Sequence, residues 1–356
     1  MSDIDLYLDE FKRELEELDS DGNRIRNNLN VNMDMDGCFS AAIMLLAYPD
    51  FKICGYNDSC TRYYSEKNLK RKSVVNLDFF CKSRGVMCID NHINSIVAES
   101  YPLKYNPNFV RGVPLDRYTE KYPFSTFLFL CAVFDHFNML PDIDIEAEIE
   151  GDMMYRGSKI RLWQLMLRAD SVLYNTMHYY ENAMDWWKWL IRISGKDGIT
   201  YKLCRKVMRF KELCDANGLD CKEESENENN YISGVFMTKY GTREKDGFNS
   251  LSNGLFSFIR DIFGLFGVTA EFPSMNELVL YTYRRILYES DDTSFFKGLI
   301  NDDRVLSYAF VRWNTISLNI REQYYDDFRN NDKMKLWFSS TDDPVEVSDF
   351  NIPIIM

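Results

Sequence analysis

The sequence predicts an α/β fold: a parallel, doubly wound sheet with a helical extension in the N-terminal domain, and a smaller C-terminal α/β domain. Three observations predict it. Short β-rich segments surround a helical stretch between residues 29 and 89, residues 123–215 have helical periodicity, and the last third mixes strand-like and helical segments. A length of 356 residues and 46% hydrophobic content fit about two packed domains.

The first elements follow in order. Residues 3–19 place apolar side chains at helical spacing between charged ones, and Asp21-Gly22 ends this predicted surface helix. Strands are expected at 29–33, 51–56, 73–77 and 85–89, with a helix at 39–46 between the first two. This order favours parallel pairing, and ligands of such sheets bind beyond the carboxyl ends of the strands.

The later elements are less regular. Residues 123–215 are expected to be mainly helical, whereas 215–230 (DANGLDCKEESENENN) are so polar that they predict a linker. A helix is expected near 275–290, within a C-terminal α/β part. The predicted divisions are therefore 1–195, then 196–230 as a helix and acidic linker, then 231–356.

Composition limits the partners. With 42 basic and 55 acidic residues the net charge is −13, so duplex DNA is an unlikely partner. A small phosphorylated ligand held by a metal ion remains compatible with this charge. The nine cysteines are scattered without a CxxC pair and are expected to be reduced thiols. Because there is no signal peptide and no apolar run of about 18 residues, we expect a cytoplasmic protein without a membrane segment.

Polar side chains follow three of the predicted strands. Asp34 and Asp36 come after the first, Asp78 ends the third, and Asp90-Asn91-His92 follow the fourth. One such strand end is often an ordinary turn. Three in order, at one edge of one sheet, predict a shared site for hard cations.

These segments, NMDMDG, VVNLD and IDNH, resemble the first three motifs of the DHH phosphoesterase superfamily, over about half of the chain. The resemblance implies a two-ion hydrolase, usually manganese-dependent, with a C-terminal substrate-binding domain. By position, Asp34 would bind one ion, Asp36 the other, and Asp78 both. Asp170, in LMLRADSVLYN, is the candidate for the fourth motif, because a buried carboxylate in an apolar helical run needs a partner. The alternative is an exposed helix residue.

The third motif supplies the predicted catalytic residues. Asp90 and His92 would act there, with His92 on the scissile phosphate. Asn32 and Asn91 stand where the family has histidine ligands. An amide oxygen suits Mg²⁺ or Ca²⁺ better than Mn²⁺, so either the site keeps a harder metal or it has lost activity and serves binding.

Candidate substrate contacts are fewer. Arg312, after SYAFV, resembles the family's arginine strand weakly, and Arg243 and Lys245 follow Tyr240-Gly241. His136 and His178 lie in apolar or aromatic stretches and are interpreted as packing residues. The tryptophans in the segment WWKW at 186–189 are interpreted as an interdomain core, with a base-stacking platform as the alternative.

The sequence therefore predicts a phosphoesterase that uses Mn²⁺ or Mg²⁺, two ions if active, on a phosphodiester of a small nucleotide or a short single-stranded oligonucleotide. The alternative is a catalytically inactive module that binds a nucleotide or a protein. Whether the chain forms a homodimer is left open.

Overall fold

The computed structural model describes residues 3–57, 62–97, 104–149, 154–240, 251–273, 278–329 and 334–335. The chain forms two compact units. Residues 1–34, 52–121 and 272–356 make the first, termed the sheet unit, and residues 35–51 and 122–271 make the second, termed the helical unit. The predicted boundaries near 195 and 230 do not coincide with this division, because the helical unit is built from segments inserted into the sheet unit.

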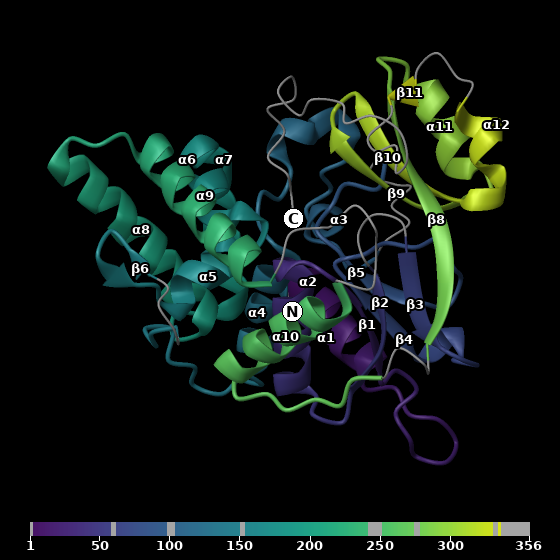
Figure 1. Ribbon diagram of the computed structural model, residues 1–356, viewed down its shortest axis with the longest axis horizontal. Coiled ribbons are helices and arrows are strands. Elements are labelled where there is room, and N and C mark those ends of the chain that lie inside the picture. The colour runs from purple at the N-terminus through teal and green to yellow at the C-terminus, as the bar shows by residue number, and fades with distance from the viewer. Residues whose placement is uncertain are drawn as a thin grey trace. The chain divides into compact units, whose positions relative to one another are not determined.

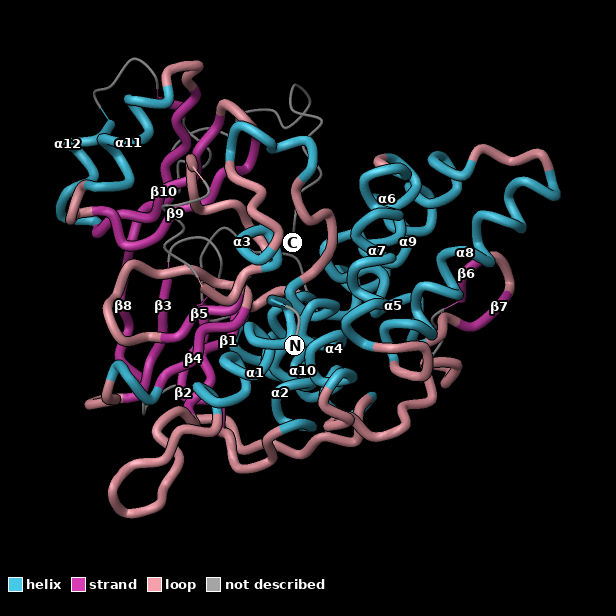
Figure 2. Tube along the Cα trace, turned by 180° about the vertical axis from the view of Figure 1, so that it is seen from behind, coloured by secondary structure: helices cyan, strands magenta, loops and turns pink. Residues whose placement is uncertain are grey.

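The sheet unit contains a mixed sheet, with strand order β5-β4-β1-β2-β3-β8-β10-β9 and β11 paired to β8. Figure 2 draws the strands in magenta. Its strands are β1 (Asn28–Asn32), β2 (Lys52–Asn57), β3 (Arg62–Glu66), β4 (Val74–Leu77), β5 (Met87–Ile89), β8 (Leu278–Glu289), β9 (Val305–Arg312), β10 (Thr315–Arg321) and β11 (Met334–Lys335). β1 pairs in parallel with β2 and β4, and β4 with β5. The α/β class and the four predicted N-terminal strands are confirmed. Doubly wound connectivity stays a prediction.

The strand β8 corrects one expectation. Residues 275–290 were expected to be helical, but Leu278–Glu289 form a long strand that pairs antiparallel with β3 on one side and β10 on the other. Figure 1 shows β8 running beside both the N-terminal and the C-terminal strands. The segment LVLYTYRRILYE is rich in branched and aromatic residues, which fit a pleated surface. The C-terminal strands therefore extend the N-terminal sheet.

The helices of the sheet unit are short apart from the first. They are α1 (Asp3–Leu15), α3 (Pro107–Val110), α11 (Thr293–Asn301) and α12 (Tyr325–Arg329), with 3₁₀ turns at Arg71–Ser73, Leu115–Glu120 and Glu322–Tyr324. α1 ends at Leu15, before the predicted end near residue 19. It buries Leu8, Phe11 and Leu15, whereas Leu6 and Leu18, which the spacing also placed on the apolar face, are exposed. A second apolar cluster joins Phe80 and Ile93 to the C-terminal strands through residues such as Phe310.

The helical unit confirms the expected helices between 123 and 215. Its elements are α2 (Met35–Ala47), α4 (Thr126–His136), the short strands β6 (Met154–Tyr155) and β7 (Ser158–Lys159), α5 (Leu162–Arg168), a 3₁₀ turn (Ala169–Ser171), α6 (Val172–His178), α7 (Tyr180–Ser194), α8 (Ile199–Asn217), α9 (Cys221–Tyr240) and α10 (Leu251–Leu265). The expected acidic linker is wrong for residues 221–230, which lie in α9. Ser225, Glu228 and Ile232 are buried along one face of α9, so its packing uses polar side chains that looked like linker residues.

The tryptophan segment belongs to the core of the helical unit. Trp186 and Trp187 are fully buried, and Trp187 Nε1 donates to Thr176 Oγ1 at 3.2 Å. The expected burial is confirmed, but the ring partners Tyr122, Phe124 and Phe129 belong to the same unit, and the buried rings offer no stacking platform. His136 Nδ1 lies 3.1 Å from the Ile193 carbonyl oxygen, and His178 Nδ1 lies 3.0 Å from that of Tyr174, as expected for packing residues. Among the described residues no helix combines the length and apolar character needed to cross a bilayer.

Candidate metal centre

Two neighbouring parallel strands of the sheet unit end in carboxylates. Asp78 follows β4 directly and Asp90 follows β5 directly. The strands are aligned with Leu77 opposite Ile89, so the next residue of each emerges at the same edge. The Asp78 amide donates to the Ile89 carbonyl at 2.9 Å, and Asp78 has a positive φ of 57°, a conformation that aspartate tolerates better than most residues. Register and turn together place the two carboxylates side by side.

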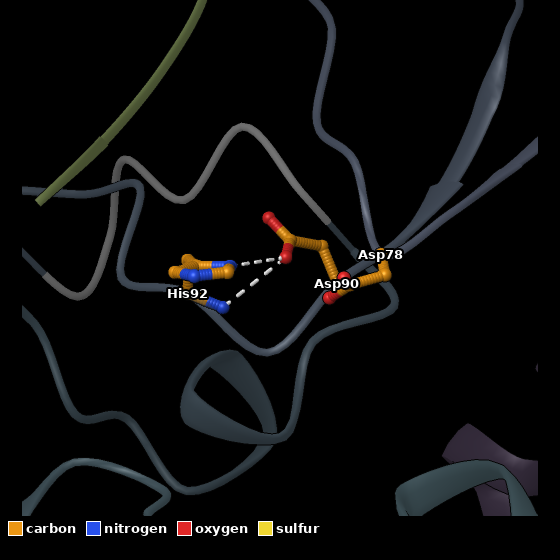
Figure 3. Close-up of side chains that lie close together, drawn as sticks. All are labelled: Asp78, Asp90 and His92. Carbon is orange, nitrogen blue, oxygen red and sulfur yellow. Dashed lines mark hydrogen bonds and ion pairs between the residues drawn. The ribbon is translucent and has the colours of Figure 1, made fainter. Parts of the chain in front are cut away.

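Asp78, Asp90 and His92 form a compact group of possible metal ligands (Figure 3). One ligand atom from each lies within 4.8 Å of the others. Asp78 and Asp90 are buried, at 5% and 2% exposure, whereas 32% of the His92 side chain is exposed. Carboxylate oxygens and an imidazole nitrogen are a donor set that divalent ions accept. The group therefore fits a cation that is reached from the His92 side, and the predicted meeting of these strand ends is confirmed.

Asp90 also orients the histidine. Its Oδ1 lies 2.7 Å from His92 Nδ1 and 3.4 Å from the His92 backbone nitrogen, and its Oδ2 accepts from Asn94 Nδ2 at 3.2 Å. Asn106 Nδ2 donates to the His92 carbonyl at 2.6 Å and to Asn94 Oδ1 at 3.2 Å. A carboxylate on Nδ1 fixes the ring and directs Nε2 toward other groups, as second partners do at many metal sites.

The segment after His92 is tied to other elements of the sheet unit. The Phe310 amide of β9 donates to the Ile93 carbonyl at 2.9 Å. Asn91 is buried, and its carbonyl accepts from Asn108 Nδ2 at 2.7 Å. The backbone of Asn91 is thus held by α3, and a metal-ligand role for its side chain stays a prediction.

Asn32 lies between two carboxylates at the end of β1. Its Nδ2 donates to Asp34 Oδ2 at 2.6 Å and to Asp78 Oδ2 at 2.9 Å, while its Oδ1 accepts from Asn57 Nδ2 at 3.2 Å. Tyr283 of β8 in turn donates to Asn57 Oδ1. Asn32 was predicted to offer its oxygen to a metal. Its oxygen accepts from Asn57 in this structure, and a metal-ligand role for Asn32 stays a prediction.

Asn57 and Tyr283 were missed by the sequence reasoning. Asn57 is buried at the end of the apolar strand β2, the same pattern that drew attention to Asp78 and Asp90. The polar residue at the end of an apolar strand could therefore have identified Asn57. No sequence pattern indicated Tyr283, because its segment was expected to be a helix.

Asp36 and Asp170 belong to the helical unit. Asp36 is 1% exposed, and its two oxygens accept from the backbone nitrogens of Thr126 and Phe127, both at 2.7 Å, so it caps the N-terminus of α4. Oxygens of Asp36 and Asp170 lie within 4.8 Å of each other. Burial raises the pKa of Tyr122, and the charges of Asp36 and Asp170 add to this effect.

Asp170 is half-buried and differs from the expected helix position. It sits in the 3₁₀ turn between α5 and α6 with a φ of 47°, followed by Ser171 with a φ of 55°. Two successive left-handed residues interrupt the helical run, which periodicity alone did not predict. The proposed roles of Asp36 and Asp170 in a shared two-ion centre stay predictions.

The predicted substrate contacts have little structural support. Arg312 is exposed at the end of β9, next to Trp313, which is 58% exposed. Arg243 and Lys245 lie outside the described residues. Comparison of the chain with protein-family models, curated proteins and solved structures found no match.

Proposed function

We propose that this chain is a metal-dependent phosphoesterase that hydrolyses a phosphodiester of a small nucleotide or a short single-stranded oligonucleotide. The observation that carries the proposal is the group of Asp78, Asp90 and His92, buried except for the histidine, at the carboxyl ends of adjacent parallel strands. Ligands of such sheets bind at this edge.

Each residue has a distinct role in the proposal. Asp78 and Asp90 bind the ion, Mn²⁺ or Mg²⁺, through carboxylate oxygens. Asp90 also holds the His92 ring through Nδ1, so that Nε2 contacts the scissile phosphate. A bound divalent ion supplies a water of lowered pKa and positive charge against the phosphate oxygens. Arg312 is retained as a weaker candidate for a terminal phosphate.

Two further arguments support this choice. The strand-end residues resemble the first three motifs of the DHH phosphoesterases. By that resemblance, Asp36 and Asp170 of this chain would bind a second ion. The net charge of −13 disfavours long polyanions, which favours small substrates. The same negative charge disfavours duplex DNA as a partner.

One observation favours a second candidate function, a catalytically inactive nucleotide- or protein-binding module. Asn32 Nδ2 already bridges Asp34 and Asp78, and backbone amides of α4 already bind Asp36. These carboxylates thus have protein donors where an active centre would hold ions. A module that binds without a metal would keep this arrangement.

Metal binding separates the two functions. The melting temperature of the wild type would be compared in chelator, Mn²⁺ and Mg²⁺, beside Asp78→Asn and Asp116→Asn. Asp116 is an exposed aspartate of the same unit and serves as the matched control. We expect a metal-dependent rise in the wild type and in Asp116→Asn, and none in Asp78→Asn.

Hydrolysis would be followed by chromatography of dinucleotides and short oligonucleotides incubated with each ion. Products that appear with the wild type and Asp116→Asn, but not with Asp78→Asn or His92→Ala, support the phosphoesterase. Absence of both metal binding and hydrolysis would favour the binding module. Hydrolysis that survives Asp78→Asn would refute the site.

A further inference from the structure

Two thiols meet in the segment between β4 and β5. Cys81 lies in the loop after β4 and is half-buried, and Cys88 lies in β5 at 5% exposure. Their sulfur atoms are 3.9 Å apart, and both are free thiols. A disulfide needs sulfurs about 2.05 Å apart, so a side-chain adjustment of about 2 Å would join them.

A buried amide fixes both sulfurs. Asn76 of β4 is 2% exposed, and its Nδ2 donates to Cys81 Sγ at 3.3 Å and to Cys88 Sγ at 3.6 Å. Asn30 Nδ2 of β1 donates to Asn76 Oδ1 at 3.0 Å, which orients that amide. Donors directed at sulfur stabilise the thiolate, which is the nucleophilic form.

The surroundings of Cys81 also favour its thiolate form. The pKa of its thiol is lowered, chiefly by the hydrogen bond from Cys88, against the effect of burial. Asn76 and the positive charge of Arg71 lower it further. By contrast, burial raises the pKa of Cys54 to about 12. Cys81 is also the more exposed of the two thiols, half-buried where Cys88 is only 5% exposed, so a reagent in solution meets Cys81 first.

Both cysteines line a pocket of about 710 Å³ in the sheet unit. Its wall includes four basic residues, Lys82, Arg84, Lys104 and Lys297, and one acidic residue, Glu14. Lys104 is neutralised by Glu10, at 2.6 Å, but Arg84 and Lys297 have no ion pair with any residue in the described ranges. In a chain of strong negative charge, this pocket favours small anions.

We propose that Cys81 and Cys88 are a reactive dithiol that a small anionic disulfide, entering this pocket, oxidises to an intramolecular disulfide. The Cys81 thiolate attacks one sulfur of the reagent, forming a mixed disulfide and releasing one reagent thiolate. Cys88 then loses its proton and attacks Cys81 Sγ, which releases the second reagent thiol. The protein loses two electrons and two protons, and the reagent disulfide is reduced to two thiols.

The test uses the reduced full-length chain with glutathione disulfide, which is anionic, and cystamine, which is cationic, followed by thiol blocking and peptide mass spectrometry. We expect a Cys81–Cys88 link that forms at least several-fold faster with glutathione disulfide. Cys88→Ala should trap the mixed disulfide on Cys81, and Cys81→Ala should give neither product. The double variant Arg84→Gln/Lys297→Gln should lose most of the preference for the anionic reagent.

The chain provides an internal control. Cys214 and Cys221 are also close enough to interact, but neither lines the basic pocket that holds Cys81 and Cys88. This pair should react more slowly in the same digest. The proposal is overturned if no Cys81–Cys88 link forms, if it forms no faster than a Cys214–Cys221 link, or if both reagents react equally fast. The wild-type measurements decide this even if a variant does not fold, and they are independent of phosphoesterase activity.

Discussion

Replacement of Asn32 tests the geometry of the candidate centre directly. The Asn32 amide donates to two carboxylates, at 2.6 and 2.9 Å, and each hydrogen bond to a charged group contributes about 1.5–3 kcal/mol. Asn32→Ala should therefore lower the free energy of unfolding by about 3 kcal/mol or more in the presence of a chelator.

Asn32→Asp is the sharper variant. It would place a third carboxylate within hydrogen-bonding distance of Asp34 and Asp78, where two like charges about 4 Å apart repel by about 4 kcal/mol at an effective dielectric constant of 20. The variant should respond by raising a carboxyl pKa within the group, so the folded state binds an extra proton. Its stability should then fall as the pH rises through that raised pKa, and a divalent ion should restore it.

The assay is urea denaturation over a range of pH, with chelator or with Mg²⁺. Asn68→Asp adds the same charge at an exposed turn and is the matched control. If Asn32→Asp is as stable as Asn68→Asp in chelator at neutral pH, the three side chains do not converge as described and the reasoning fails.

Two further predictions concern the helical unit. A Cβ atom on Gly198 would lie 2.2 Å from Asp135 Cγ, so Gly198→Ala should displace the carboxylate that accepts from the first amides of α8 and lower the free energy of unfolding by about 3 kcal/mol. Gly234→Ala, with open space around its position in α9, should be neutral or stabilising in the same urea titration, and equal effects of the two would contradict this account. Burial raises the pKa of Glu228 above its ordinary 4.5, although Gln164 opposes the shift, so the ionised carboxylate penalises folding once the pH exceeds that raised pKa. Glu228→Gln should therefore be more stable than the wild type at neutral pH by about 1.4 kcal/mol per unit of pKa shift, and should lose this advantage below pH 4.5. Melting temperatures of both proteins over a pH series would measure this, and a difference that does not change with pH would exclude the charge of Glu228 as its cause.

The parallel part of the sheet and its polar edge were predictable because both depend on local patterns. Apolar strands that end in Asp78 or Asp90 show where each strand stops, and parallel pairing then brings those ends together. The hydrogen-bond partners within the centre could not be predicted in the same way. Asn32 donates to Asp78 only because β1 and β4 are neighbours in the observed register, which depends on the whole sheet.

The errors have a common physical origin. β8 was mistaken for a helix because its strand character is completed by pairing with β3 and β10, partners that are distant in the sequence. The acidic segment was mistaken for a linker because a helix was expected to bury apolar residues. In α9 the buried positions include Ser225, whose hydroxyl donates to the Lys222 carbonyl of the same helix, and Glu228, whose carboxylate accepts from Gln164 of α5.

The pairing of β3 with β8 has a consequence for biosynthesis. During translation, β3 emerges long before β8, so one edge of the early strands presents open backbone hydrogen-bonding groups until the last part of the chain leaves the ribosome. Shortened chains that end before residue 278 would keep this edge permanently exposed and should self-associate. Completion of the sheet is thus a late and slow step, as contacts between distant segments require.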